Sequence, residues 1–126
     1  DALSFDGNTG PYVQYTYART CSVLEKVNEE GEMTAAPLSE VEFELAKCLS
    51  VFPERVASAV SEYEPSIVTR YILDLCAAFN RFYHECSIAN CDIPDLKQSR
   101  IALTRATRQV LGTALHLICM QSPEKI

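Results

Sequence analysis

The sequence has no tryptophan and only four glycines among its 126 residues. Hydrophobic residues make up 48% of the chain, which is enough for one core without metal or disulfide staples. This composition excludes a disordered chain. A membrane-spanning helix needs about 20 consecutive apolar residues, and no apolar run in the sequence is nearly that long. The first residues also lack the basic start and the apolar block of a signal peptide. We therefore expect a single globular domain in the cytoplasm.

The signatures of several enzyme classes are also missing. The sequence has no Walker-type glycine-rich loop and no Gly-x-Ser-x-Gly elbow. Its two histidines, His84 and His116, fall in different predicted helices without an obvious partner. The acidic residues are scattered and give no recognisable acid–base pair. We therefore assign no catalytic residue to this chain.

Cysteine is plentiful, but its spacing indicates neither disulfides nor a metal site. None of the six cysteines belongs to a Cys-x-x-Cys pair. Five fall within helical patterns, where a free thiol behaves as a small hydrophobe: Cys21, Cys48, Cys76, Cys86 and Cys119. Cys86 and Cys91 could join His84 in a metal site, but no clear fourth ligand is present. We predict reduced, mostly buried thiols and no metal.

The formal net charge of −6 argues against a general affinity for nucleic acid. The charge is unevenly distributed, however. Ten acidic and three basic residues lie between Glu25 and Glu64, whereas residues 97–109 contain four basic residues and no acidic one. Because salt limits electrostatic attraction to about 8–10 Å, this local basic stretch matters more than the sum. Taken alone, such a stretch is more often the solvated face of a helix than a nucleic-acid site.

Hydrophobic periodicity predicts five helices and no strand. We expect the helices to begin at Pro11, Ser39, Pro53, Pro65 and Pro94. The first helix should end at about Glu29, with Gly31 as its terminating glycine, and the last at about Met120. Ser39 and Glu42 have the spacing of a capping box. The predicted fold is an all-α antiparallel helical bundle.

Apolar stripes predict which helix faces are buried. In the fourth helix the core positions are Val68, Ile72, Leu75, Phe79, Phe82 and Cys86. In the third helix they are Val56, Val60 and Tyr63. In the fifth helix they are Leu103, Ala106, Val110, Ala114 and Leu117. A polar face beside this last stripe carries Lys97, Arg100, Thr104 and Arg108.

The most informative segment is residues 5–19, a glycine-rich turn that leads into the first helix. Pro11 is tolerated in a first turn, and Asn8 or Thr9 can cap it. Along this helix Tyr12, Tyr15 and Arg19 recur at spacings of three and four, so they share one face. The core stripe of the same helix is Val13, Tyr17 and Leu24, with Cys21 and Val27 beside it. Two phenols and a guanidinium on one face can stack on bases and hold phosphates.

These motifs carry a resemblance to a known family. Residues 7–19 read G-N-T-G-P-Y-x-Q-Y-x-Y-A-R and resemble the helix that leads from the catalytic domain into the anticodon-binding domain of arginyl-tRNA synthetases. Residues 64–83, 100–111 and 122–126 resemble the rest of that helical, DALR-type domain of class I synthetases. The resemblance covers nearly the whole chain and is weakest at residues 28–50.

The resemblance implies a piece of a larger enzyme. Residues 1–10 would be an extended lead-in from the missing catalytic domain, and residues 11–126 the anticodon-binding domain. The HIGH-type and KMSKS-type signatures with which such synthetases bind ATP are absent. The fragment should therefore be inactive alone and need no cofactor, whereas the parent enzyme would use ATP and magnesium to attach arginine to tRNA.

The implied partner is the anticodon stem and loop of arginine tRNA, besides the enzyme's own catalytic domain. In the family, the residues matching Tyr12, Tyr15 and Arg19 contact this region. The residue matching Tyr83 helps form a pocket for the middle anticodon base, and the last residue, here Ile126, closes it. All arginine codons share a middle G, so a protein that accepts every arginine tRNA should read the middle C of the anticodon.

The basic stretch adds Arg100 and Arg108 as candidate tRNA contacts.

Two departures from the family pattern weaken the expected tRNA-binding site. Glu25 stands where a second arginine is common, with Lys26 beside it about 100° around the helix. Ser87 stands where some relatives have an aromatic residue.

Alternative interpretations remain for these residues. Tyr83 could be a half-buried phenol that packs between helices, and Tyr12 and Tyr15 could contact the catalytic domain rather than tRNA. For the whole chain, the alternative function is a helical protein-interaction or regulatory bundle without RNA binding. Neither DNA nor a membrane is an expected partner.

Overall fold

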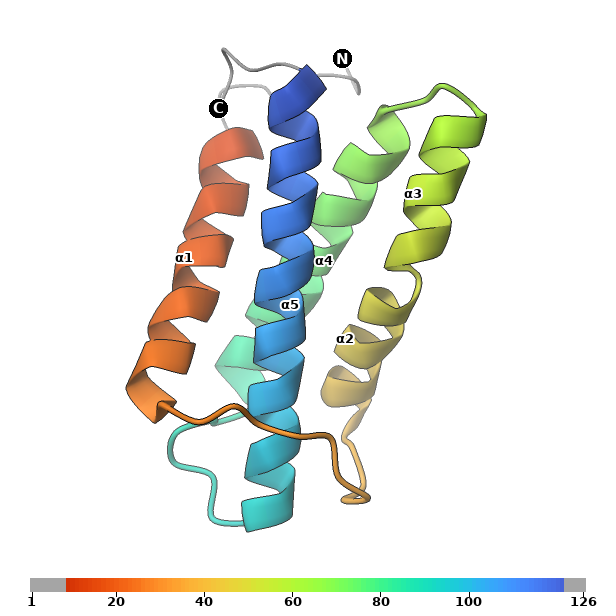
Figure 1. Ribbon diagram of the computed structural model, residues 1–126. Coiled ribbons are helices and arrows are strands. Elements are labelled where there is room, and N and C mark those ends of the chain that lie inside the picture. Colours follow the sequence, from red (N-terminus) through yellow and green to blue (C-terminus); the bar gives the residue numbers. More distant parts are fainter. Residues whose placement is uncertain (1–8, 122–126) are drawn as a thin grey trace.

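The computed structural model describes residues 9–121, with side chains for residues 10–116. It contains five helices (Figure 1). They are α1 at Thr9–Val27, α2 at Glu40–Ser50, α3 at Phe52–Ser61, α4 at Ser66–Glu85 and α5 at Pro94–Gln121. The described residues contain no strand, which confirms the predicted all-α class. Most of the predicted lead-in over residues 1–10 lies outside the described part.

The helices form a bundle of four legs, because α2 and α3 are two pieces of one leg (Figure 1). The leg breaks at Val51, whose φ of −93° and ψ of 2° leave helical geometry, and Pro53 lies in the first turn of α3. Consecutive legs are antiparallel, as predicted. In contrast, α1 and α4 are neighbours that run in the same direction, so the end of α1 lies beside the end of α4.

Helix α4 lies at the centre of the core and packs on all four other helices. Its six predicted core positions are buried: Val68, Ile72, Leu75, Phe79, Phe82 and Cys86. The predicted capping box at the start of α2 is also present. The Ser39 N–H donates to Glu42 Oε1 at 2.7 Å, and the Glu42 N–H donates to Ser39 Oγ at 3.3 Å.

The buried face of α5 differs from the prediction. Thr104, assigned to the polar face, is fully buried, and so is Thr107. Each hydroxyl donates to the carbonyl four residues earlier, at 3.0 and 2.8 Å, so burial leaves no polar atom unsatisfied. Of the predicted core positions, Leu103 and Ala114 are buried and Ala106 and Val110 are half-buried. Leu117 lies outside the described side chains.

The predicted core stripe of α3 is wrong at two of its three positions. Val60 is 69% exposed and Tyr63 is 91% exposed, whereas Val56 is half-buried. Tyr63 lies beyond the end of α3 with a φ of 53°, which turns the chain away before the stripe can continue.

Helix α1 ends at Val27, before the predicted end at Glu29, because Asn28 adopts a left-handed conformation with a φ of 53°. The Asn28 N–H donates to the Leu24 carbonyl at 3.0 Å, which is the bond of an αL cap. Gly31 therefore does not end the helix as predicted.

Gly31 instead lets residues 28–39 cross α5, and we call this segment the strap (Figure 1). Gly31 has a φ of 77°, and a Cβ there would lie 2.5 Å from Ile101 Cγ2. The Glu32 N–H donates to the Gln98 carbonyl at 3.1 Å. The strap thus fastens the α1–α2 connection to α5.

Candidate nucleic-acid interface

The tyrosines and the arginine of α1 meet two residues of α4. Tyr12, Tyr15 and Arg19 lie on one face of α1, as their spacing predicts, and Asn80 and Tyr83 face them. We call these five residues the aromatic cluster. Tyr15 is 55% exposed, Tyr12 38% and Tyr83 37%, so the cluster lies at the surface of the bundle.

Arg19 is the centre of the aromatic cluster. Its Cζ lies 4.2 Å from the centroid of the Tyr83 ring and 4.8 Å from that of Tyr15, which are cation–π distances. Its Nη1 donates to Asn80 Oδ1 at 3.0 Å, and its Nη2 donates to the Tyr15 hydroxyl. The guanidinium is therefore held in place before any ligand binds, while the rings beside it stay partly exposed.

Asn80 was not predicted as a site residue, yet it joins the two helices. Its Nδ2 donates to the Tyr12 hydroxyl at 3.3 Å and to the buried Thr16 Oγ1 at 3.1 Å. The sequence contains one indication that Asn80 belongs to the site. Asn80 precedes Tyr83 by three residues, so the two side chains share one face of α4.

Tyr83 is partly packed and partly free. Its ring centroid lies 6.3 Å from that of Phe79, which anchors it to the core, and 5.4 Å from that of His84 in an edge-on arrangement. The ring thus packs against the core, as the packing interpretation of Tyr83 expects, and it keeps an exposed part, which a base contact would need. The exposed part of the ring is available for stacking.

The structure does not bring Arg100 into the aromatic cluster. Its Nε lies 2.5 Å from Glu42 Oε2, and its Nη1 donates to the Ser87 carbonyl. Glu42 is only 1% exposed. Burial raises the pKa of the Glu42 carboxyl, but hydrogen bonds from the Ser39 backbone and the Arg100 guanidinium outweigh it and hold the pKa below its ordinary value. Arg100 is thus already engaged in an ion pair.

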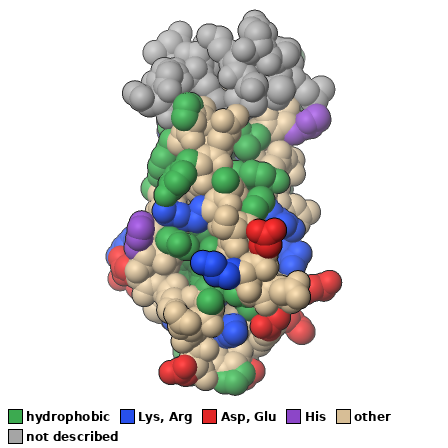
Figure 2. Space-filling view, turned by 90° about the vertical axis from the view of Figure 1, so that its left-hand side faces the viewer, with side chains coloured by type: hydrophobic (Ala, Val, Ile, Leu, Met, Phe, Trp, Pro, Cys, Tyr) green, Lys and Arg blue, Asp and Glu red, His purple; other side chains and the backbone are tan. Residues whose placement is uncertain are grey.

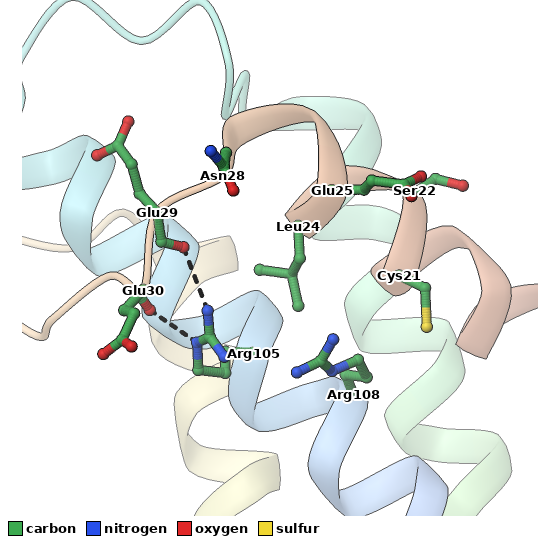
Figure 3. Close-up of a pocket in the computed structure, with 9 residues that line it drawn as sticks. All are labelled: Cys21, Ser22, Leu24, Glu25, Asn28, Glu29, Glu30, Arg105 and Arg108. Carbon is green, nitrogen blue, oxygen red and sulfur yellow. Dashed lines mark hydrogen bonds between the residues drawn. The ribbon is translucent and has the colours of Figure 1, made fainter.

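Arg108 lies on another side of the bundle, in a hollow of about 630 Å³ between α1 and α5 (Figure 3). Glu25 lines this α1–α5 hollow too. Arg105 donates to the carbonyls of Glu30 and Glu29, at 2.8 and 3.2 Å. A tRNA contact by Arg108 would therefore be separate from the aromatic cluster. The predicted contact at Ile126 lies outside the described residues.

Glu25 and Lys26 face different sides of α1. Lys26 lines a second depression of about 470 Å³, which we call the α1–α4 groove, together with Val23, Val27 and residues 83–89. Figure 2 looks onto the side of the bundle on which α1 lies, where basic side chains gather across the middle and acidic ones lie mainly toward the lower end. Of the two neighbours Glu25 and Lys26, the lysine is thus the one that shares a depression with Tyr83.

The described part of the chain shows neither a metal-binding cluster nor a membrane-spanning helix. No three His, Cys, Asp or Glu residues there are placed to hold a metal ion. The five cysteines for which the structure gives a state are free thiols. Burial raises the pKa of Cys86, one of the residues of the possible metal set, which disfavours the thiolate that a metal needs. No helix among the described residues is long and apolar enough to cross a membrane.

The fold and the cluster define an all-helical domain with a tyrosine- and arginine-bearing surface. The family model of the DALR anticodon binding domain matches residues 13–126. The chain belongs to the DALR anticodon-binding domain family.

Individual relatives are arginine–tRNA ligases. The chain is 44% identical over 128 residues to that of Clostridium botulinum strain 657 and 45% identical over 131 residues to that of Clostridium perfringens strain 13. All of this chain is covered in both, but only 23% of each relative. The solved structure of Thermus thermophilus arginyl-tRNA synthetase matches 91% of this chain and 21% of its own, with a TM-score of 0.82 and 34% identity.

Proposed function

We infer that this chain is the tRNA-binding domain of an arginine–tRNA ligase and binds the anticodon stem and loop of arginine tRNA. The observation that carries the proposal is the aromatic cluster, in which Arg19 is fixed between partly exposed tyrosine rings. Unpaired loop bases bind proteins by stacking on such rings, at about 1–3 kcal/mol per base. Membership of an anticodon-binding family supports the same function.

The residues assigned to tRNA contact are Tyr12, Tyr15, Arg19, Tyr83 and Ile126, with Arg100 and Arg108 as further candidates. In this proposal Tyr83 stacks on the middle base of the anticodon. Arg19 orders the tyrosines and supplies positive charge beside the loop backbone.

In the whole enzyme, the domain would select the tRNA while another domain attaches arginine to it with ATP and magnesium. Residues 11–126 would form the tRNA-binding domain, and residues 1–10 would connect it to the catalytic domain. We assign no residue of this chain to ATP or magnesium, and we expect the isolated domain to be inactive. The cytoplasm, where tRNA is charged, is the expected location.

The test is a titration with an RNA hairpin that reproduces the anticodon stem and loop of an arginine tRNA, and with a hairpin whose middle C is replaced by G. Binding should weaken with rising salt and should favour the C hairpin. Equal binding of the two hairpins would contradict the proposal and favour a protein-interaction bundle.

Tyr83→Ala tests the stacking residue. It should weaken binding of the C hairpin by about 1–3 kcal/mol. Tyr63→Ala is the matched control, because Tyr63 is 91% exposed and lies outside the aromatic cluster. Circular dichroism melting should show that both variants stay folded. If Tyr83→Ala is folded and binds like the control, Tyr83 is only a packing residue.

A further inference from the structure

A second depression between α1 and α5 adjoins the α1–α5 hollow, and it is lined by positive groups. Its volume is about 590 Å³, and Tyr17 of α1 and side chains of α5 form its walls. We call it the basic depression, because the guanidiniums of Arg105 and Arg108 and the imidazole of His116 line it. No described residue in its lining carries a carboxylate. A depression with this excess of positive groups attracts anions.

The two guanidiniums of the basic depression have no carboxylate partner. Arg108 is half-buried, and within the described residues it belongs to no ion pair. Arg105 donates to the carbonyls of Glu30 and Glu29, which are neutral acceptors and leave its charge uncompensated. In Figure 3, dashed bonds join Arg105 to the strap, whereas Arg108 has none to the residues drawn. Half-buried charges are normally paired, so this arrangement favours an anion from outside the chain.

The surrounding carboxylates decide on which side of the arginines an anion binds. Arg105 and Arg108 border both depressions. Glu25, Glu29 and Glu30 line the α1–α5 hollow, where they repel an anion. The basic depression contains none of these side chains. An anion that pairs with the two arginines therefore binds on the side of the basic depression.

The neutral groups of the basic depression suit a phosphate. Gln109 and Thr113 add an amide and a hydroxyl to its lining. Gly112 lets the Tyr17 ring lie against α5, because a Cβ there would be 3.3 Å from Tyr17 Cε1 and 3.7 Å from the Tyr17 hydroxyl. Arginine with tyrosine, threonine and glutamine is the set of side chains that contacts the phosphates of nucleic acids. A guanidinium can also bind a phosphate with two parallel hydrogen bonds.

The basic depression and the aromatic cluster lie on different sides of α1. Tyr17 is two residues from both Tyr15 and Arg19, which is about 200° around the helix. The helix between them has a diameter of about 10–12 Å with its side chains, a distance that one RNA hairpin can span. An RNA whose loop bases contact the cluster would therefore reach the basic depression with a part of its backbone outside the loop.

We propose that the basic depression binds a backbone phosphate of the anticodon stem, with Arg108 and Arg105 as its charged ligands. This inference rests on the proposed function for the source of the phosphate. It adds a second contact surface, on the side of α1 away from the aromatic cluster. Because a phosphate carries no base identity, this contact strengthens binding without selecting the anticodon.

The test compares Arg108→Gln with Arg55→Gln in the 126-residue chain. Arg55 is the matched control, because it lines a different depression, between α2, α3 and α4, and also belongs to no ion pair within the described residues. Neither substitution strands a paired carboxylate, so both variants should stay folded, as circular dichroism melting would show. A third variant, Arg108→Lys, keeps the charge. The probes are the arginine anticodon hairpin, the same loop without its stem, and inorganic phosphate.

Arg108→Gln should weaken binding of the hairpin about 5-fold, the upper end for an exposed ion pair. It should reduce the slope of log K against log salt by about 0.7–0.9, the value for one phosphate. Its preference for the C hairpin over the G hairpin should equal that of the unmodified chain, and its affinity for the stemless loop should be unchanged. Arg108→Lys should keep the slope, and Arg55→Gln should change none of these quantities.

Three results would overturn the inference. If Arg108→Gln keeps the salt slope of the unmodified chain, the RNA backbone does not bind here. If, in that case, inorganic phosphate shifts the amide signals of α5 in nuclear magnetic resonance spectra of the unmodified chain but not of Arg108→Gln, the ligand is a free phosphate ion instead. If the stemless loop loses as much affinity as the hairpin, the phosphate belongs to the loop and not to the stem.

Failure of the proposed function would look different. The unmodified chain would then bind the C and G hairpins equally, whatever Arg108→Gln does to the salt slope. The two hairpins thus test the reading of the anticodon, and the Arg108 variants test the phosphate contact.

Discussion

Replacing Arg100 by methionine should destabilise the domain strongly. The change removes the guanidinium that pairs with Glu42 at 2.5 Å and leaves a carboxylate that is 1% exposed. Removing one partner of a buried ion pair costs about 3–5 kcal/mol. The Arg100 side chain is 15% exposed and the Ser39 N–H still donates to Glu42, so we expect the lower end, about 3 kcal/mol.

The measurement is urea denaturation at pH 7 followed by far-ultraviolet circular dichroism. The midpoint should fall while the slope against urea stays unchanged. Adding Glu42→Gln to Arg100→Met should restore about 1–2 kcal/mol, because the double variant buries no unpaired charge and glutamine still fits a capping box. An Arg100→Met variant within about 0.5 kcal/mol of the unmodified chain would refute the reasoning, since that is the size of an ordinary surface substitution. Arg100 would then be free for tRNA, as the sequence predicts.

The same pair predicts how stability depends on pH. The folded-state pKa of Glu42 lies below its ordinary value of 4.5, so the folded protein holds this proton less tightly than the unfolded chain does. Its contribution to stability is complete above pH 4.5 and is lost as the pH falls through the folded-state pKa. The difference in unfolding free energy between the unmodified chain and Glu42→Gln should therefore shrink on acidification. A difference that grows in acid would contradict the assigned direction.

Three further predictions concern single residues. Gly31→Ala should lower the free energy of unfolding, measured in urea, by about 1–3 kcal/mol, because residue 31 has a positive φ and a Cβ there would clash with Ile101. An unchanged urea midpoint would contradict the packing of the strap against α5. Asn80→Ala should weaken binding of the anticodon hairpin, because Arg19 loses an acceptor; unchanged affinity would show that the cluster does not need the amide. Burial raises the pKa of Cys76 to about 11, so iodoacetamide at pH 8 should leave it unmodified in the folded chain, as read by mass spectrometry; rapid labelling would contradict its burial.

The helices were predictable because each has strong local signals. Proline and a capping box mark the starts, and steps of three and four mark the buried stripe of α4. The buried face of α5 was not predictable in the same way. Thr104 and Thr107 read as polar, but each hydroxyl is satisfied within its own helix, and the sequence cannot show that neighbouring helices then cover them.

The candidate site was also predictable only where a local pattern specifies it. The shared face of Tyr12, Tyr15 and Arg19 follows from spacing within one helix. The part played by Asn80 depends on how α4 packs against α1, which no local pattern specifies. Likewise, only the packing decides that Lys26 shares a depression with Tyr83 while Glu25 lines the α1–α5 hollow.

The position of α5 has a consequence for synthesis on the ribosome. Helix α1 packs mainly on α5, and the strap that follows α1 is also bonded to α5 (Figure 1). Within this domain, helix α1 leaves the ribosome before the other helices and therefore waits for α5 before its apolar face is fully covered. Long-range pairing of this kind delays folding and leaves hydrophobic surface exposed meanwhile. The domain should thus complete its fold only after the whole segment has emerged, and a nascent chain that stops before α5 should be a substrate for chaperones.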